Sequence, residues 1–226
     1  MDIGGVLMIK SRMKDPVSGL THAFGAGLSV AALVLLLEKT LRLGASGWHI
    51  ASFAVFGAGM VLLYSASATY HLLNLRAQTM RLLRKLDHIM IFVLIAATYT
   101  PICLIALRGP WGWALFGAVW GLAALGIVFK AIWFDAPRWL YTLCYVLLGW
   151  ACLACVVPLV RAMPADALIW LAGGGVAYTL GAVGYALKWP GRNNRWFGFH
   201  EVFHIFILAG TLCHFVMMYR YLAVMA

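Results

Sequence analysis

The chain has 226 residues, of which 64% are hydrophobic and 11% are charged, and its formal net charge is +10. Soluble domains contain roughly 45–50% apolar and about 25% charged residues, so this composition excludes an ordinary soluble domain and indicates an integral membrane protein. In such a protein an excess of Lys and Arg sets the membrane topology and attracts anionic lipid. We therefore expect no nucleic-acid partner.

Seven long runs without a charged residue divide the chain. Each has about the 17–25 residues that a helix needs to cross a bilayer core. The runs lack the alternating polar pattern of a barrel strand, so a backbone in lipid must satisfy its hydrogen bonds within helices. The sequence predicts an all-α integral membrane protein, with a seven-transmembrane helix bundle over residues 20–226 and a cytoplasmic N-terminal segment over residues 1–19. The uncharged runs are 20–37, 43–75, 88–107, 109–129, 139–160, 167–187 and 202–219.

Lysine and arginine are distributed unevenly between the two sides of this predicted bundle. Segments facing the cytoplasm carry an excess of both residues, so their distribution favours an N-terminus inside the cell and a C-terminus outside. We therefore expect a multi-pass protein of the bacterial cytoplasmic (inner) membrane. The cytoplasmic set is Lys10, Arg12, Lys14, Arg76, Arg81, Arg84, Lys85, Lys130, Arg138, Lys188, Arg192 and Arg195, and the outer set is Lys39, Arg42, Arg108, Arg161 and Arg220.

Five polar side chains from three predicted helices fall in one layer near the cytoplasmic face. His200 and His204 share a face of the last helix, about 6 and 12 Å from its cytoplasmic end. His71 and Ser67 reach the same two depths in the second helix, and Asp87 lies about 10 Å inside the third. Ionisable residues inside a membrane are costly and tend to face the bundle interior in functional roles. This layer is therefore the predicted functional site.

Each of these residues has a simpler interpretation when it is taken alone. A single transmembrane histidine is often a hydrogen-bonded packing residue, and Asp87 could pair with Arg84 or cap the start of its helix. Three imidazoles gathered from two helices favour a metal site instead, because neutral imidazoles with one open coordination position suit a catalytic Zn²⁺ site. The predicted metal ligands are His71, His200 and His204.

The segment HEVFH, residues 200–204, also fits the HExxH pattern of zinc proteases, in which a glutamate activates water. That pattern is incomplete here, because membrane zinc proteases need a third ligand, usually an acidic residue, and the chain has none after Glu201. Glu201 lies about 100° around the helix from His200, near the membrane surface. A capping or snorkelling role is favoured for Glu201, and a role as a catalytic base is the alternative.

The depth of a residue along its helix also distinguishes two other histidines from the predicted ligands. His214 lies near the His200 face of the helix but about 21 Å farther along, so we do not expect it to bind the same ion. His22 falls on the cytoplasmic side near the membrane surface. There it either lines the mouth of a cavity or serves only in packing.

The motifs resemble those of a known family. Ser67-x-x-x-His71, Asp87 and His200-x-x-x-His204 are similar to the SxxxH, D and HxxxH motifs of the haemolysin III family. That family is the bacterial branch of the progestin and adipoQ receptor superfamily, to which alkaline ceramidases are distantly related. The resemblance covers essentially the whole chain. It implies zinc held by the three histidines, with Asp87 and Ser67 around a water molecule on the metal.

A further N-terminal motif departs from the family pattern. The stretch Asp15-x-x-Ser18-x-x-Thr21-His22 is similar to ExxNxxTH, but Asp replaces Glu and Ser replaces Asn. We therefore transfer no role to Asp15 or Ser18 from the resemblance.

Two functions of different classes would use the predicted site. In a hydrolase, zinc activates water and polarises a carbonyl, Asp87 accepts the proton of the water, and Ser67 hydrogen-bonds to the developing oxyanion or positions Asp87. The substrate class implied by the resemblance is a ceramide-like or other acyl-amide lipid. The alternative is a non-catalytic lipid sensor or receptor-like protein with structural zinc. The family name adds a membrane-damaging activity, although no span has the polar stripe of a wide channel.

Overall fold

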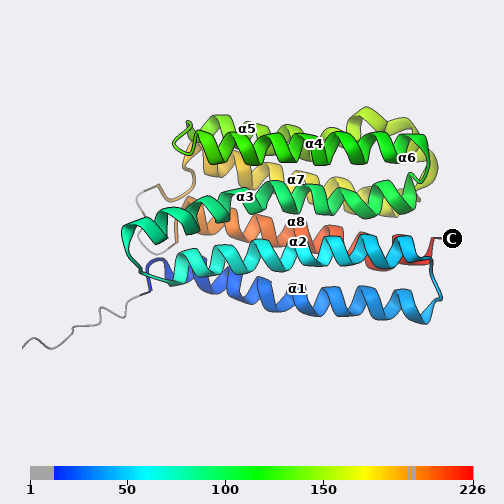
Figure 1. Cartoon of the computed structure of the whole chain (residues 1–226), viewed down its shortest axis with the longest axis horizontal. Helices are drawn as coiled ribbons and strands as arrows, with labels where there is room; N and C mark the ends of the chain where they lie inside the picture. The colour runs from blue at the N-terminus through cyan, green and yellow to red at the C-terminus, as the bar shows by residue number, and fades with distance from the viewer. Residues whose placement is uncertain (1–12, 193, 195–196, 226) are drawn as a thin grey trace, which may run out of the picture.

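Long helices lie side by side in the computed structural model of the chain (Figure 1). The structure describes residues 13–192, 194 and 197–225, and it contains no β-strand within those residues. The long elements are α1 (Pro16–Arg42), α2 (Gly47–Leu72), α3 (Ala77–Pro101), α4 (Pro110–Ile132), α5 (Arg138–Gly149), α6 (Val156–Ala162), α7 (Ala165–Leu187) and α8 (Phe199–Arg220), and the short ones are η1 (Ile102–Ala106), η2 (Ala151–Cys155) and η3 (Leu222–Val224).

Seven helical stretches in the described part are long and apolar enough to cross a membrane, with mean hydropathies from 1.5 to 2.4. Helices α1, α2, α4 and α7 each make one, and the other three combine α3 with η1, α5 with η2 and α6, and α8 with η3. This confirms the predicted all-α membrane fold. Because the number of spans is odd, α1 begins and α8 ends at opposite ends of the bundle (Figure 1). Which end faces the cytoplasm stays a prediction.

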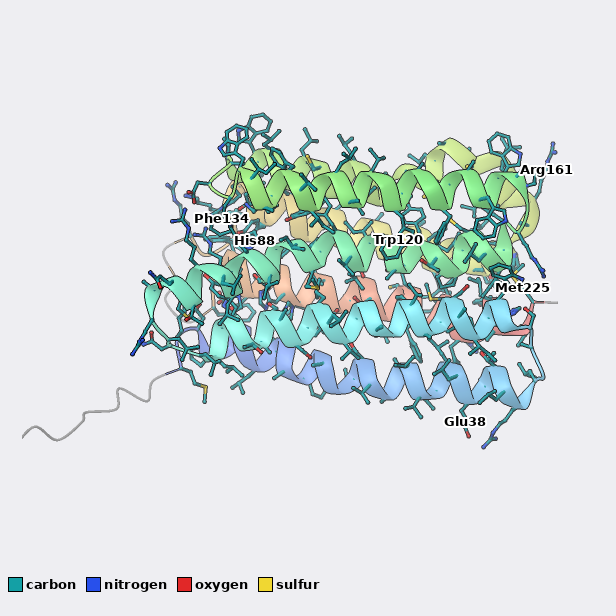
Figure 2. All side chains as sticks on the ribbon, viewed as in Figure 1. Glu38, His88, Trp120, Phe134, Arg161 and Met225 are labelled. Carbon is teal, nitrogen blue, oxygen red and sulfur yellow. The ribbon has the colours of Figure 1, made fainter. Side chains whose placement is uncertain are left out.

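Large apolar side chains cover the outside of the bundle, and Leu125, Ile169 and Leu187 are each more than half exposed. An apolar exterior of this extent suits contact with lipid. Phe134 lies at the end of the bundle where α1 begins, and Arg161 lies at the other end (Figure 2). The side chains of three residues that we assigned to the cytoplasmic side, Arg81, Arg84 and Lys85, surround the Phe134 ring. Of that set, Lys10, Arg12 and Arg195 lie outside the described residues.

Glycines bring α1 close to both α2 and α8. A Cβ atom on Gly25 would lie 2.7 Å from Cδ2 of Leu208 in α8, and Gly57 of α2 lies directly against Leu33 of α1. Small residues at such positions allow the close backbone approach by which membrane helices associate. The start of α1 is therefore held beside the end of α2 and the start of α8, where the predicted site lies.

The fifth span is interrupted. Helix α5 ends at Gly149, and α-helical structure resumes only at Val156, after the 3₁₀ segment η2. The Tyr99 hydroxyl on α3 donates a hydrogen bond to the Gly149 carbonyl at 2.6 Å and accepts one from the Cys152 N–H at 2.9 Å. Unpaired backbone groups are costly in lipid, so this tyrosine supplies hydrogen bonds that the broken helix lacks.

Several helix ends differ from the predicted ones. Helix α2 ends at Leu72 rather than near residue 75, and α8 begins at Phe199 rather than near residue 196. His71 and His200 therefore lie in the terminal turns of their helices, instead of about 6 Å inside them. An uncharged run records composition and does not distinguish a helix from the apolar loop residues that continue it, which is why the predicted end of α2 was too far out. Helix α1 begins at Pro16, because proline is favoured in the first turn of a helix.

Candidate metal centre

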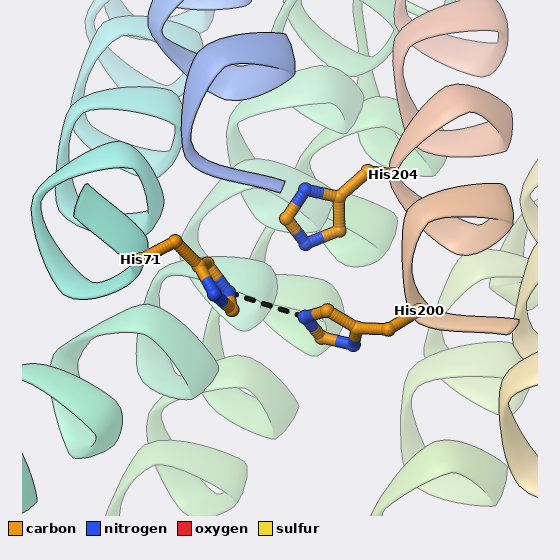
Figure 3. A group of neighbouring side chains, drawn as sticks. All are labelled: His71, His200 and His204. Carbon is orange, nitrogen blue, oxygen red and sulfur yellow. Dashed lines mark hydrogen bonds between the residues drawn. The ribbon is translucent and has the colours of Figure 1, made fainter. Parts of the chain in front are cut away.

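Three histidine side chains converge at one end of the bundle (Figure 3). His71 comes from the last turn of α2, and His200 and His204 come from the first two turns of α8. One ligand atom from each ring lies within 4.8 Å of the other two. The Nε2 atoms of His71 and His200 are 3.1 Å apart, so both rings direct the same nitrogen toward one point.

The donor set fits a divalent metal ion. Tetrahedral zinc binds histidine nitrogen at about 2.0–2.1 Å, which puts neighbouring ligand atoms roughly 3.3 Å apart, close to the Nε2 separation of His71 and His200. His71 and His204 are each 2% exposed, so both rings are shielded from solvent. Neutral imidazoles are the form that binds metal. The three histidines predicted as ligands could therefore hold one ion.

Asp15, the residue before α1, contacts this cluster directly. One of its carboxylate oxygens lies 3.0 Å from Nδ1 of His71, and its backbone N–H donates to the His71 carbonyl at 2.9 Å. The hydrogen bond from His71 lowers the pKa of Asp15 to about 2, helped by Lys14 at 3.1 Å and opposed by partial burial. Asp15 is thus ionised at neutral pH. The sequence analysis gave Asp15 no role. Its position in the N-terminal motif was the only feature of the sequence that could have indicated one.

Glu201 forms a cap at the start of α8. Its side chain, at the third position of the helix, accepts a hydrogen bond from the backbone N–H of the N-cap residue Gly198 at 2.8 Å. The other carboxylate oxygen accepts the Ser18 hydroxyl at 2.6 Å. The capping role favoured for Glu201 is confirmed. Both oxygens of its carboxylate are engaged in this way.

Ser67 and Asp87 line one cavity together with His200 and His204. The Ser67 hydroxyl is buried and has no hydrogen-bond partner among the described residues. Asp87 lies in the third turn of α3, which begins at Ala77, so it does not cap that helix. Nor does it form an ion pair with Arg84 within the described chain, where one of its carboxylate oxygens lies 3.6 Å from Nδ1 of His88. Neither simpler interpretation of Asp87 is therefore realised in the structure.

Comparison with known proteins decides the family. Residues 10–215 match the family described as Haemolysin-III related. The chain belongs to this family. It is 34% identical over 202 residues to Hemolysin-3 from Bacillus cereus, covering 89% of both chains, and 35% identical over 202 residues to the Hemolysin-3 homolog from Bacillus subtilis (strain 168), covering 89% of this chain and 91% of that one. The family predicted from the motifs is confirmed.

The relationship reaches beyond bacteria. The chain is 25% identical over 209 residues to the human Monocyte to macrophage differentiation factor, covering 89% of this chain and 82% of the human protein. The matched family region includes all five predicted site residues.

His22 is more deeply placed in this haemolysin-III-related chain than its sequence position suggested. It is 3% exposed, and its ring stacks on His204 with centroids 3.6 Å apart. Neither ring nitrogen has a hydrogen-bond partner among the described residues, and the side chain lines the same cavity as Ser67. Of the two roles considered for His22, lining a cavity is the one that the structure bears out, and because α1 starts earlier than predicted the residue lies about 9 Å inside that helix.

The cavity of this family member has a volume of about 300 Å³ and is mainly apolar. It reaches from Asp87 and His200 at the histidine end to Leu168 and His214, one or two helical turns short of the opposite end of the bundle. His214 lies 3.3 Å from the Leu171 carbonyl and is not part of the metal-ligand cluster, as expected from its depth. A small polar centre thus adjoins a long apolar chamber.

Proposed function

We propose that this haemolysin-III-related protein is a zinc-dependent hydrolase of lipid amides. The observation that carries this proposal is the position of the histidine cluster at one end of the apolar cavity, which His200 and His204 line together with Ser67 and Asp87. Binding sites are typically apolar chambers of about 300–1,000 Å³ in which a few polar groups fix the orientation of the ligand. An acyl chain in the cavity would bring its amide to the histidine end.

Each polar residue would have a distinct part in the reaction. Zinc, held by His71, His200 and His204, would activate water and polarise the carbonyl of the substrate. Asp87 would orient the attacking water and accept its proton. The unpartnered Ser67 hydroxyl would donate a hydrogen bond to the carbonyl oxygen as negative charge develops there.

A second candidate function is a lipid sensor or receptor-like role with structural zinc. A metal ion at this site would tie α2 to α8, and occupation of the cavity by lipid could then shift the helices. The names of the two Bacillus relatives also suggest a membrane-damaging activity. We favour hydrolysis, because Ser67 and Asp87 line the same apolar cavity as His200 and His204.

The proposed location is the bacterial cytoplasmic membrane, with the histidine end facing the cytoplasm. Support comes from the basic residues gathered around Phe134 at that end of the bundle, since cytoplasmic ends are enriched in lysine and arginine. Membrane lipid is then the partner of the protein, as substrate or as ligand.

The decisive test is product release from a panel of acyl-amide and acyl-ester lipids in nanodiscs. We compare the wild type with Asp87→Asn and His200→Ala. Asp87→Asn should retain zinc but lower the rate of hydrolysis by at least ~100-fold, the lower end of what a general base contributes. Equal turnover in all three samples would reveal a contaminant and end the enzyme proposal. No turnover in any sample, with zinc bound to the wild type, would favour the sensor.

A further inference from the structure

The first turn of α1 contacts two of the three candidate ligands. The Asp15 carboxylate lies 3.0 Å from Nδ1 of His71, and the backbone carbonyl of Ser18 lies 3.2 Å from Nδ1 of His204. Both contacts are made by oxygen atoms, and in each histidine the contacted nitrogen is Nδ1. These two histidines belong to different helices, so one short segment reaches both sides of the cluster.

This arrangement selects one tautomer for each ring. A carboxylate or carbonyl oxygen can only accept a hydrogen bond, so Nδ1 must carry the proton in a neutral imidazole. The lone pair is then on Nε2. In His71, Nε2 is the atom that faces Nε2 of His200 at 3.1 Å, where a metal would lie. Metal-binding histidines commonly donate their second N–H to an oxygen in this way, which fixes the orientation of the ring.

The segment is also attached to α2 and α8 by hydrogen bonds that do not involve the histidine rings. The Asp15 N–H donates to the carbonyl of His71 at 2.9 Å, which attaches the segment to the end of α2. The Ser18 hydroxyl donates to Glu201 at 2.6 Å, which attaches it to the start of α8. Lys14 lies 3.1 Å from the Asp15 carboxylate and also packs over the Tyr70 ring. The two acceptor oxygens are therefore positioned by contacts other than those with the histidine rings.

We propose that residues 15–18 form the outer shell of the metal centre, with Asp15 as the positioning residue for His71 and the Ser18 carbonyl as the acceptor for His204. This inference rests on the metal site of the proposed function but is independent of hydrolysis. It also gives Glu201, the glutamate within HEVFH, a part in the site. Instead of activating water, Glu201 holds the Ser18 hydroxyl and so the turn that orients the histidines.

The test is zinc affinity, measured on the purified protein by competition with a chromophoric chelator. Loss of such an outer partner typically weakens metal binding by about 10–100-fold, and we expect that rise in Kd for Asp15→Ala. The matched control is Asp135→Ala, which removes an exposed aspartate paired with Arg81 at 3.3 Å, and its Kd should equal that of the wild type. An unchanged Kd in Asp15→Ala would overturn the proposal.

A second measurement separates positioning from general stability. In ¹⁵N NMR spectra of the metal-free protein, His71 should be protonated at Nδ1 in the wild type and should populate both tautomers in Asp15→Ala. A weaker Kd with an unchanged tautomer would overturn the positioning role. If Asp15→Ala does not fold, the isosteric Asp15→Asn carries the test, since its neutral oxygen is a weaker acceptor and its Kd should rise severalfold.

The outcomes also separate this proposal from the proposed function. A wild type that binds zinc but hydrolyses no lipid defeats the hydrolase and leaves the outer shell standing. A wild type that binds no zinc defeats the metal site and the outer shell with it. Normal hydrolysis together with an unchanged Kd in Asp15→Ala defeats the outer shell alone.

Discussion

The imidazole rings of His22 and His204 stack face to face, with centroids 3.6 Å apart and planes inclined by 11°. The His22 ring also meets Tyr64 edge to face at 5.0 Å. The stack ties α1 to α8 immediately beside the candidate metal ligands, and it does so with a ring whose two nitrogens have no partner within the described chain. His22 therefore supports His204 through its ring face while its nitrogens stay available to a ligand.

Two substitutions at this position separate packing from polarity. His22→Ala removes the stacked ring and leaves a cavity, so the free energy of unfolding should fall by on the order of 2 kcal/mol. His22→Phe keeps a ring of similar shape and buries no unpaired nitrogen, so its melting temperature should equal or exceed that of the wild type. Thermal unfolding in one detergent measures both. A melting temperature lower in His22→Phe than in His22→Ala would contradict the stacking role.

Zinc content tests the ligand set. Purified protein should carry about one zinc per chain, and replacing His71, His200 or His204 with alanine should remove most of it, since each supplies one ligand atom. His214→Ala, which removes a histidine outside the ligand cluster, is the matched control and should retain its zinc. Elemental analysis of the purified proteins gives the answer. Full retention in all three ligand variants would eliminate the site.

Ser67 offers a substitution that should affect function without harming the fold. Its buried hydroxyl has no partner among the described residues, and such a group usually costs about 1–3 kcal/mol, so Ser67→Ala should be at least as stable as the wild type. Loss of a hydrogen-bond donor to the oxyanion should slow hydrolysis by about 10²–10³-fold. Parallel measurements of melting temperature and turnover test this. A strongly destabilised Ser67→Ala would mean that the hydroxyl has a structural role.

Membrane orientation can be tested with reporter fusions. A reporter fused after Ala226 should be located outside the cytoplasm, whereas one inserted near Arg192 should be cytoplasmic, because the cytoplasmic segments hold most of the lysine and arginine. Paired activity reporters, each active on one side of the membrane only, measure the two positions. The reverse pattern would put the histidine cluster at the outer face and would remove cytoplasmic access to the site.

The sequence by itself determined the class of the fold and the identity of the central residues. The thickness of a bilayer sets the length of a spanning helix, so uncharged runs of sufficient length were enough to predict seven spans. Helical periodicity puts His200 and His204 on one face, and comparable depths brought His71 into the same layer. These conclusions depend only on local geometry and on the cost of polar groups in lipid, both of which can be read from one chain segment at a time.

Only the tertiary structure decided which residues support that centre. Asp15 and His71 are 56 positions apart, and Ser18 and Glu201 are 183 apart, so no local pattern relates the members of either pair. Their contacts depend on how closely α1 approaches α2 and α8, which small residues such as Gly25 permit, and on a first turn that begins at Pro16. The first predicted span began at residue 20, although the chain has no charged residue from 16 to 37, so the sequence analysis left this turn out. Close packing between distant segments brings oxygen atoms of Asp15 and Ser18 within hydrogen-bond distance of His71 and His204.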